Sequence, residues 1–229
     1  MAESSAESSA KSPRERYRAQ VRAEIKGHAR EQIATAGASA LSLNAIAKRM
    51  GLSGPALYRY YANRDELITE LVTDAYRSLA DAFRAVDPPR PDLAALAHAL
   101  RDWALEDPQR YLLIYGTPVP GYRAPDDVTA VSDEILGILL GACRAAPADG
   151  TRTALEARFE AHLEEHLRPA GDRTVAPAAL HRALTFWTRL HGVLSLELAG
   201  HFSGMGFDPA LLFAAELENL LGGAEGTAA

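Results

Sequence analysis

The chain has 229 residues, 48% of them hydrophobic, which suffices for one large domain or two small ones. Because Cys143 is the single cysteine, an intramolecular disulfide is excluded. The sequence has no run of 18 apolar residues that could span a membrane, and no apolar signal segment follows Met1. We therefore expect a cytoplasmic protein without membrane contact. The net charge of −6 argues against a nucleic-acid binder only as an average, because residues 11–64 carry 11 Lys or Arg against 3 Asp or Glu, while residues 65–229 carry 13 against 25.

The N-terminal region combines a polar tail with a basic segment. Residues 1–12 are rich in Ser, Ala and Glu and are predicted to be disordered. A helix is predicted over Tyr17–Thr35, because Val21, Ile25, Ala29 and Ile33 recur at every fourth position. The basic residues of this region allow two interpretations, a flexible arm in the minor groove of DNA or a solvated helix face. These residues are Arg14, Arg16, Arg18, Arg22, Lys26 and Arg30.

The segment 42–64 has the pattern of two short helices joined by a tight turn. Ser42 is an expected N-cap, and Gly51 ends the first helix because glycine readily adopts the left-handed conformation. Ser53 is expected to cap the second helix, with Pro55 in its first turn. The first helix has Leu43, Ile46, Ala47 and Met50 at helical spacing. Such a helix-turn-helix can place its second helix, predicted over 54–60, in the major groove of DNA.

This segment resembles the DNA-binding signature of the TetR family of transcriptional regulators. The matching positions are Ile46-Ala47, Gly51-Leu52-Ser53, Leu57-Tyr58, Tyr60-Tyr61 and Asn63-Arg64. The resemblance implies that Gly54, Pro55 and Tyr58 lie against bases or thymine methyls, and that Arg59, Tyr60 and Arg64 hold phosphates. It also implies that Asn44 reaches a base or a phosphate, and that Ser53 belongs to the DNA-binding residues. Leu57 and Tyr61 are expected in the core.

The sequence departs from the usual pattern of the family at Gly54 and Ala56. Both lack a side-chain donor, which leaves fewer direct base contacts, although Arg59 could compensate by reading a guanine. One recognition helix does not give tight specific binding. We therefore expect a homodimer on a palindromic operator in double-stranded DNA, with recognition helices about 34–36 Å apart or a multiple of that distance.

The remaining sequence predicts helices, because no segment alternates at period two. They cover residues 63–86, 92–106, 108–115, 127–145, 151–168, 176–202 and 209–221, with a Pro-rich loop at 116–125. Cys143 ends an apolar run and is expected to pack inertly. The predicted fold class is all-α. A three-helix helix-turn-helix domain (13–64) is linked through helix 63–86 to a helical-bundle ligand-binding and dimerisation domain (65–221), followed by a loose tail (222–229).

The C-terminal half resembles a regulatory-domain type of the same family. The match rests on the loop 116–122, on Trp187-x-x-x-His191-Gly192, and on Leu196-Glu197-Leu198. The resemblance implies dimerisation through the last two helices, whose small residues Ala199, Gly200, Ala214 and Ala215 would permit close packing. It also implies a repressor, released from its operator when an apolar or aromatic small molecule changes the angle between two DNA-binding heads.

An apolar pocket is therefore expected in the regulatory domain. Its candidate lining residues are Phe83, Trp103, Tyr111, Tyr115, Phe159, Phe186 and His191. For each of them, packing in the core of the bundle is the alternative, because helical bundles need large apolar fillers.

Two rival functions are open at this stage. His162, Glu165 and His166 match the inverted zinc-protease pattern H-x-x-E-H, which would make the protein a zinc-dependent hydrolase. The acidic helical context and the lack of a marked third ligand favour a solvated helix instead, so we expect no enzyme, no metal and no cofactor. A nonspecific architectural DNA binder would show no preferred palindrome.

Overall fold

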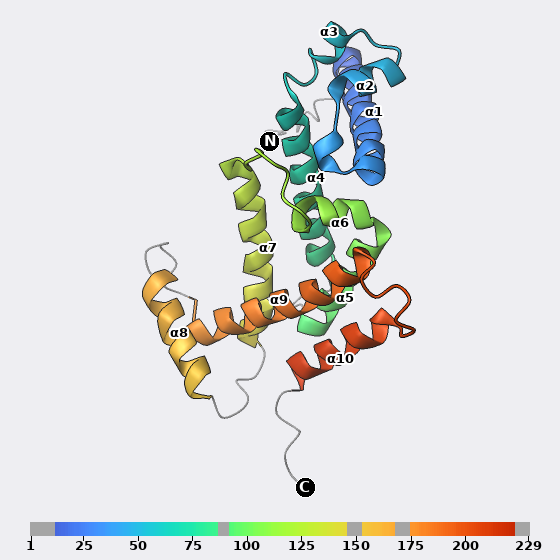
Figure 1. Cartoon of the computed structure of the whole chain (residues 1–229). Helices are drawn as coiled ribbons and strands as arrows, with labels where there is room; N and C mark the ends of the chain where they lie inside the picture. The colour runs from blue at the N-terminus through green and yellow to red at the C-terminus, as the bar shows by residue number, and fades with distance from the viewer. Residues whose placement is uncertain (1–11, 87–91, 146–152, 168–174, 223–229) are drawn as a thin grey trace, which may run out of the picture. The chain divides into compact units, whose positions relative to one another are not determined.

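The computed structural model of the chain describes residues 12–86, 92–145, 153–167 and 175–222, and all regular structure in these ranges is helical (Figure 1). The elements are α1 (Pro13–Ala36), a 3-10 turn (Ala38–Ala40), α2 (Leu43–Arg49), α3 (Gly54–Leu57), α4 (Arg64–Arg84), α5 (Leu93–Glu106), α6 (Pro108–Tyr115), α7 (Asp126–Ala145), α8 (Ala154–Leu167), α9 (Pro177–Leu198) and α10 (Pro209–Leu221). The predicted all-α class is confirmed.

Packing divides the chain into two units, and the division falls within α4. The first unit is Met1–Leu71 with Val119–Tyr122, and the second is Val72–Pro118 with Arg123–Ala229. The sequence placed the boundary at residue 64, where α4 begins. The contacts place it after Leu71, because the first part of α4 packs with α1.

Helix α1 begins before the predicted Tyr17. The Ser12 hydroxyl accepts a hydrogen bond from the Glu15 amide (3.2 Å), and the Glu15 carboxylate accepts one from the Ser12 amide (2.7 Å). This capping box satisfies two donors at the helix start, with Pro13 in the first turn. Ser12 therefore belongs to the helix cap, and the rest of the predicted tail lies outside the described residues. From Pro13 the basic segment is helical, so the flexible-arm interpretation does not hold.

Helix α9 organises the second unit. It packs against α5, α6, α7, α8 and α10, as Figure 1 shows for its crossing with α7. Phe83, Phe186 and Phe213 are almost completely buried in the shared core. Cys143 lies in the same core, and burial raises the pKa of its thiol to about 11. The thiol is therefore protonated at neutral pH, and its predicted packing role is confirmed.

Helix α9 ends at Leu198, before the predicted Phe202. Gly200 adopts a left-handed conformation (φ +79°), and the His201 amide donates to the Leu196 carbonyl (2.9 Å). This glycine-centred ending satisfies carbonyls of the last turn and redirects the chain. Helix α10 then starts after Asp208, whose carboxylate accepts the Ala210 amide (2.9 Å).

Candidate nucleic-acid interface and regulatory cavity

Helix α2 buries one face and exposes polar residues on the other. The Ser42 hydroxyl accepts the Ala45 amide (3.3 Å), which confirms the predicted N-cap. Asn44 and Lys48 lie four residues apart and are exposed, so they share the solvent face of the helix. Lys48 is thus a further candidate DNA contact that the sequence motif does not name, although its position one turn after Asn44 indicates it. The neighbouring Arg49 is exposed but pairs with Glu31 (2.5 Å).

The turn and the second helix are shorter than predicted. Gly51 has φ +67°, as its place after α2 indicated. Helix α3 spans Gly54–Leu57, and the chain then tightens, because the Tyr60 amide bonds to the Leu57 carbonyl three residues earlier (2.8 Å). Ser53 precedes α3 without capping it through its side chain. Tyr58 to Tyr60 thus form a turn rather than the end of a helix.

The predicted DNA-contacting residues divide into exposed and half-buried groups. Asn44, Ser53, Pro55, Tyr58 and Arg59 are exposed, and Tyr58 keeps 46% of its surface accessible. Gly54, Tyr60 and Arg64 are half-buried, while Leu57 and Tyr61 are fully buried in the core, as predicted.

Asn44 stands beside the start of α3. A Cβ on Gly54 would lie 3.7 Å from the Asn44 side-chain oxygen. The amide of Asn44 therefore offers a donor and an acceptor next to the point where Gly54 lacks a side chain.

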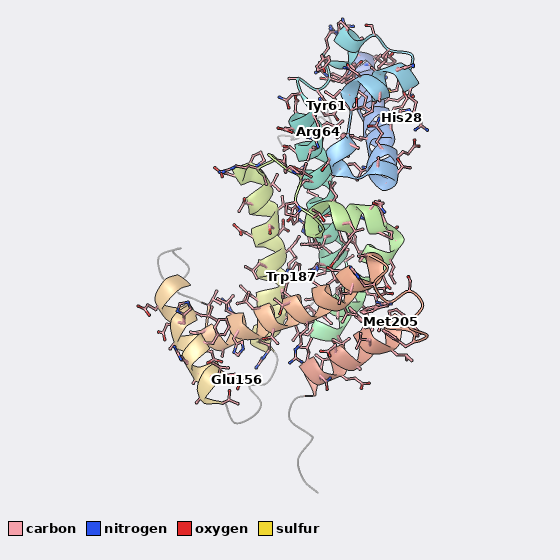
Figure 2. All side chains as sticks on the ribbon, viewed as in Figure 1. His28, Tyr61, Arg64, Glu156, Trp187 and Met205 are labelled. Carbon is pink, nitrogen blue, oxygen red and sulfur yellow. The ribbon has the colours of Figure 1, made fainter. Side chains whose placement is uncertain are left out.

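Arg64 differs from the other predicted phosphate ligands, because its guanidinium already has an internal partner. It donates to the Ala38 carbonyl (2.8 Å) and so braces the turn between α1 and α2 (Arg64 is labelled in Figure 2). The side-chain oxygen of its neighbour Asn63 accepts the Glu66 amide (2.8 Å) and caps α4.

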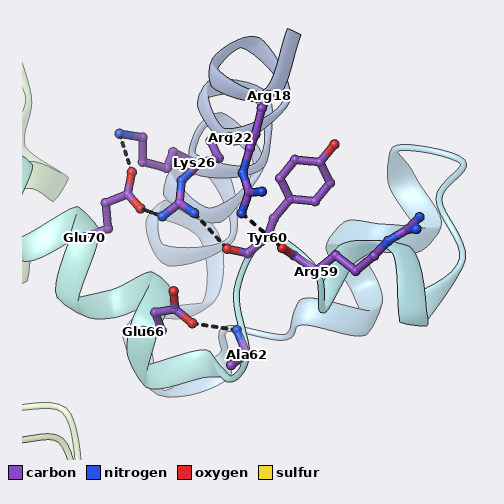
Figure 3. A network of polar contacts seen from close by, with 8 residues as sticks. All are labelled: Arg18, Arg22, Lys26, Arg59, Tyr60, Ala62, Glu66 and Glu70. Carbon is purple, nitrogen blue, oxygen red and sulfur yellow. Dashed lines mark hydrogen bonds and ion pairs between the residues drawn. The ribbon is translucent and has the colours of Figure 1, made fainter. Parts of the chain in front are cut away.

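A polar network holds the segment after α3 in place (Figure 3). Arg22 donates to the Tyr60 carbonyl (2.9 Å) and Arg18 donates to the Arg59 carbonyl (3.4 Å). Glu66 on α4 accepts the Ala62 amide (2.6 Å). The backbone that carries Arg59 and Tyr60 is therefore fixed from α1 on one side and from α4 on the other.

Glu70 is the anionic centre of this network. It forms ion pairs with Arg22 and with Lys26 (3.1 Å to the latter), and the Arg22 guanidinium also lies 4.3 Å from the centre of the Tyr61 ring. Burial alone would raise the pKa of Glu70, but hydrogen bonds from Arg22 and Lys26 outweigh it and lower the pKa below its ordinary value. Arg22 and Lys26, two of the basic residues considered for the minor-groove arm, thus form ion pairs within the first unit.

An aromatic cluster lies in the second unit, where α6 meets α9. The His191 ring lies 4.2 Å from Trp187 and 4.3 Å from Tyr115, between ring centres. Its Nδ1 is 2.8 Å from the Tyr111 hydroxyl, which also pairs with the Ser195 hydroxyl (2.8 Å). Burial lowers the pKa of His191 to about 4 and raises that of Tyr111 to about 12, so the cluster is uncharged at neutral pH.

A cavity of about 230 Å³ adjoins this cluster. Its lining residues are Tyr115, Ser132, Ile135, Leu136, Ala183, Leu184 and Trp187. Of the pocket residues named from the sequence, Tyr115 lines the cavity. Phe83, Trp103, Tyr111, Phe186 and His191 pack in the core, because large rings fill the space between the helices. Phe159 is 38% exposed on α8 and packs edge-on against His181.

The described residues give the zinc hypothesis no support. His162 and Glu165 are exposed on α8, and within those ranges no three His, Cys, Asp or Glu side chains form a group that could hold a metal ion. The side chain of His166 lies outside the description. In the same ranges no helix has the length and hydropathy needed to cross a membrane.

A helix-turn-helix with exposed polar residues, carried by a chain with a second helical unit, defines a DNA-binding regulator. Residues 27–71 match the family described as bacterial regulatory proteins of the tetR family, and residues 93–220 match the tetracyclin repressor-like C-terminal domain. The chain belongs to the TetR family of transcriptional regulators.

Individual relatives agree with this assignment. The HTH-type transcriptional regulators Rv1816 of Mycobacterium tuberculosis and Mb1846 of Mycobacterium bovis are each 36% identical over 208 residues, covering 84% of this chain and 87% of the relative. The crystal structure of the regulatory protein SCO4313 has 68% identity and a TM-score of 0.82, covering 92% of this chain and 100% of that one. A TetR/AcrR-family regulator from Thermobifida fusca, 17% identical with a TM-score of 0.54 over 92% of this chain and 100% of that chain, shares the fold.

Proposed function

We propose that the protein is a homodimeric repressor that binds a palindromic operator and leaves it when an apolar or aromatic small molecule binds the second unit. The observation that carries the proposal is the exposed set Asn44, Tyr58 and Arg59 on the helix-turn-helix of a TetR-family chain. The positive charge of the protein is concentrated in residues 11–64, which contain the helix-turn-helix, while residues 65–229 are acidic. We also propose a cytoplasmic location, because a regulator of this kind has to reach operator DNA.

The proposed DNA contacts follow from exposure and chemistry. Gly54 and Pro55 at the start of α3, and Tyr58 directly after its end, face bases and thymine methyls. The Asn44 amide supports them beside Gly54, and the exposed Ser53 also contacts the DNA. Arg59, Tyr60 and Arg64 hold phosphates and fix the register. Because Nη2 of Arg64 is bound to the Ala38 carbonyl and its Nε is buried, Arg64 would reach a phosphate through Nη1.

Dimerisation is proposed to use α9 and α10. Leu211 is 70% exposed on α10, and Met205, labelled in Figure 2, is 64% exposed in the turn before it. Leu196, Phe207 and Leu221 are also exposed, and the small residues Ala199, Gly200, Ala214 and Ala215 stand open beside them. Apolar side chains gathered on neighbouring elements are typical of a protein interface.

Release requires an effector that binds one state of the dimer better than the other. The cavity beside Trp187 is the proposed effector site. The proposed W-x3-HG motif is consistent with this site, since Trp187 and His191 lie one helical turn apart with ring centres 4.2 Å apart.

The deciding experiment is selection of bound fragments from the source genome, followed by titration of small molecules against the selected DNA. A palindromic operator near particular genes and a ligand-dependent loss of DNA affinity are expected. Equal affinity for all duplexes would instead favour an architectural DNA binder. A palindrome whose occupancy no compound of a broad library alters would contradict effector release.

A further inference from the structure

The cavity is small. Three helices form it, with Tyr115 from α6, Ser132, Ile135 and Leu136 from α7, and the remaining residues from α9. Its volume of about 230 Å³ lies between the roughly 150 Å³ that accommodates benzene and the roughly 300 Å³ at which pockets for drug-sized ligands begin. It therefore suits one substituted aromatic ring or a small fused pair of rings.

The wall of the cavity carries no ionisable side chain other than a buried phenol. Among its lining residues there is no Lys, Arg, His, Asp or Glu. Burial raises the pKa of the Tyr115 phenol, so this side chain stays neutral at neutral pH. His191, which packs against Tyr115, also stays neutral, because burial lowers the pKa of its imidazole. The cavity is partly open, since Leu136 in its wall is 39% exposed. A charged ligand would still lose part of its hydration here without gaining a counter-ion, which is costly.

The charges on the surrounding helices are directed elsewhere. Arg182 on α9 donates to the Cys143 carbonyl (2.8 Å), and Arg110 on α6 donates to the Trp103 carbonyl (2.7 Å) and to Glu106 (2.9 Å). Asp133 and Glu134 follow Ser132 on α7 and are exposed. Arg189 on α9 pairs with Glu216 (3.6 Å), and no Lys or Arg side chain lines the cavity. Arg84 pairs with Glu134 (2.6 Å), so Asp133 is the carboxylate beside Ser132 that would repel an anion.

We propose that the effector is an uncharged aromatic molecule of about nine to twelve non-hydrogen atoms with a single hydroxyl or carbonyl group, held between Trp187 and Leu136 with its polar group near Ser132. Organic acids and amines of the same size are rejected. This inference rests on the proposed function in taking the cavity as the effector site, and it adds the size and charge that the effector must have.

The test uses three probes of similar carbon skeleton: cinnamyl alcohol, cinnamate and cinnamylamine. Binding to the full chain is followed by calorimetry and by tryptophan fluorescence, to which Trp187 in the cavity wall and Trp103 in the core both contribute. Cinnamyl alcohol is expected to bind saturably and at least tenfold more tightly than either charged probe.

Ala183→Leu and Ser132→Leu fill the cavity from α9 and α7, so each should weaken binding at least tenfold. Thr188→Leu, at an exposed position of α9 outside the lining, should leave it unchanged.

Thermal melting of each variant shows whether it is folded, and two filling variants from different helices keep the test decisive if one is not. Equal or tighter binding of cinnamate or cinnamylamine would overturn the inference. So would the absence of saturable binding by the alcohol, or unchanged binding in a folded filling variant. Because these measurements need no DNA, selective binding without operator release would refute the repressor mechanism alone, whereas operator release by charged compounds would refute the inference alone.

Discussion

Arginine side chains of the first unit either form internal contacts or remain exposed, where they can bind DNA phosphates. Arg22 is half-buried, pairs with Glu70 and donates to the Tyr60 carbonyl, whereas Arg59 is exposed in the segment that Arg22 helps to hold. The residue type does not distinguish these roles, since 21 of the 24 Lys and Arg residues in the chain are Arg. Arg22 has an internal role because it pairs with the carboxylate of Glu70. Glu70 lies far from Arg22 in sequence, so hydrophobic periodicity does not predict that these two residues form a pair.

Arg59→Ala should weaken DNA binding by about five- to tenfold for operator and random duplex alike, because a lost phosphate contact carries no sequence information. The slope of log affinity against log salt should become shallower by about 1. Fluorescence anisotropy over a salt series measures both effects. Arg77→Ala, an exposed position on the second unit's part of α4, controls for the loss of one positive charge. A loss confined to duplexes with guanine at one position would show instead that Arg59 reads a base.

Glu70→Gln should destabilise the first unit by about 1 kcal/mol at neutral pH, because both ion pairs with α1 are lost. The folded-state pKa of Glu70 is lowered, so its stabilising effect is complete above the unfolded pKa near 4.5 and disappears as the pH falls through the folded value. The difference between the two proteins in free energy of unfolding should therefore shrink below about pH 4.5. Urea titrations at several pH values measure it, with Glu24→Gln as an exposed control on α1. A difference that stays constant to pH 3 would disprove the assignment.

At the scale of elements, hydrophobic spacing predicted which segments are helical, and local backbone chemistry decided where they end. The stripe Val21, Ile25, Ala29 and Ile33 is buried as expected. The Ser12–Glu15 capping box sets the start of α1 ahead of the predicted Tyr17, and the left-handed Gly200 ends α9 before the predicted Phe202. Apolar periodicity carries no information about either end.

Two glycines of the first unit should respond oppositely to the same change. Gly51→Ala forces an L-residue into φ +67° between α2 and α3 and should destabilise by about 1 kcal/mol. Gly27→Ala lies inside α1 with no atom within 4 Å of the new Cβ, so it should stabilise by about 0.5–1 kcal/mol. Thermal unfolding of both variants measures the pair. If Gly51→Ala melted no lower than the parent protein, the left-handed turn would not constrain this motif.

At the scale of the whole molecule, the sequence predicted a two-part regulator but not the position of its cavity. The proposed DNA-contacting residues follow a local motif, and the structure leaves Asn44, Tyr58 and Arg59 accessible. The cavity depends on which rings fill the space between helices distant in sequence. Rings at apolar positions were therefore named, and most of them turned out to be core, while Ser132 and Ala183 gave no signal because small residues mark a space only once their neighbours are known.

The proposed dimer can be tested with two exposed leucines. Leu211 on α10 is 70% exposed and lies in the proposed interface, while Leu155 on α8 is 74% exposed and lies outside it. A carboxylate at position 211 would be buried without a partner on dimerisation, so Leu211→Glu should yield monomers at micromolar concentration in analytical ultracentrifugation. Operator affinity should fall more than tenfold, because two half-sites must be held together for tight binding. Leu155→Glu makes the same chemical change and should leave both properties intact. If Leu155→Glu were instead the variant that dissociates, the two-fold contact would run through α8.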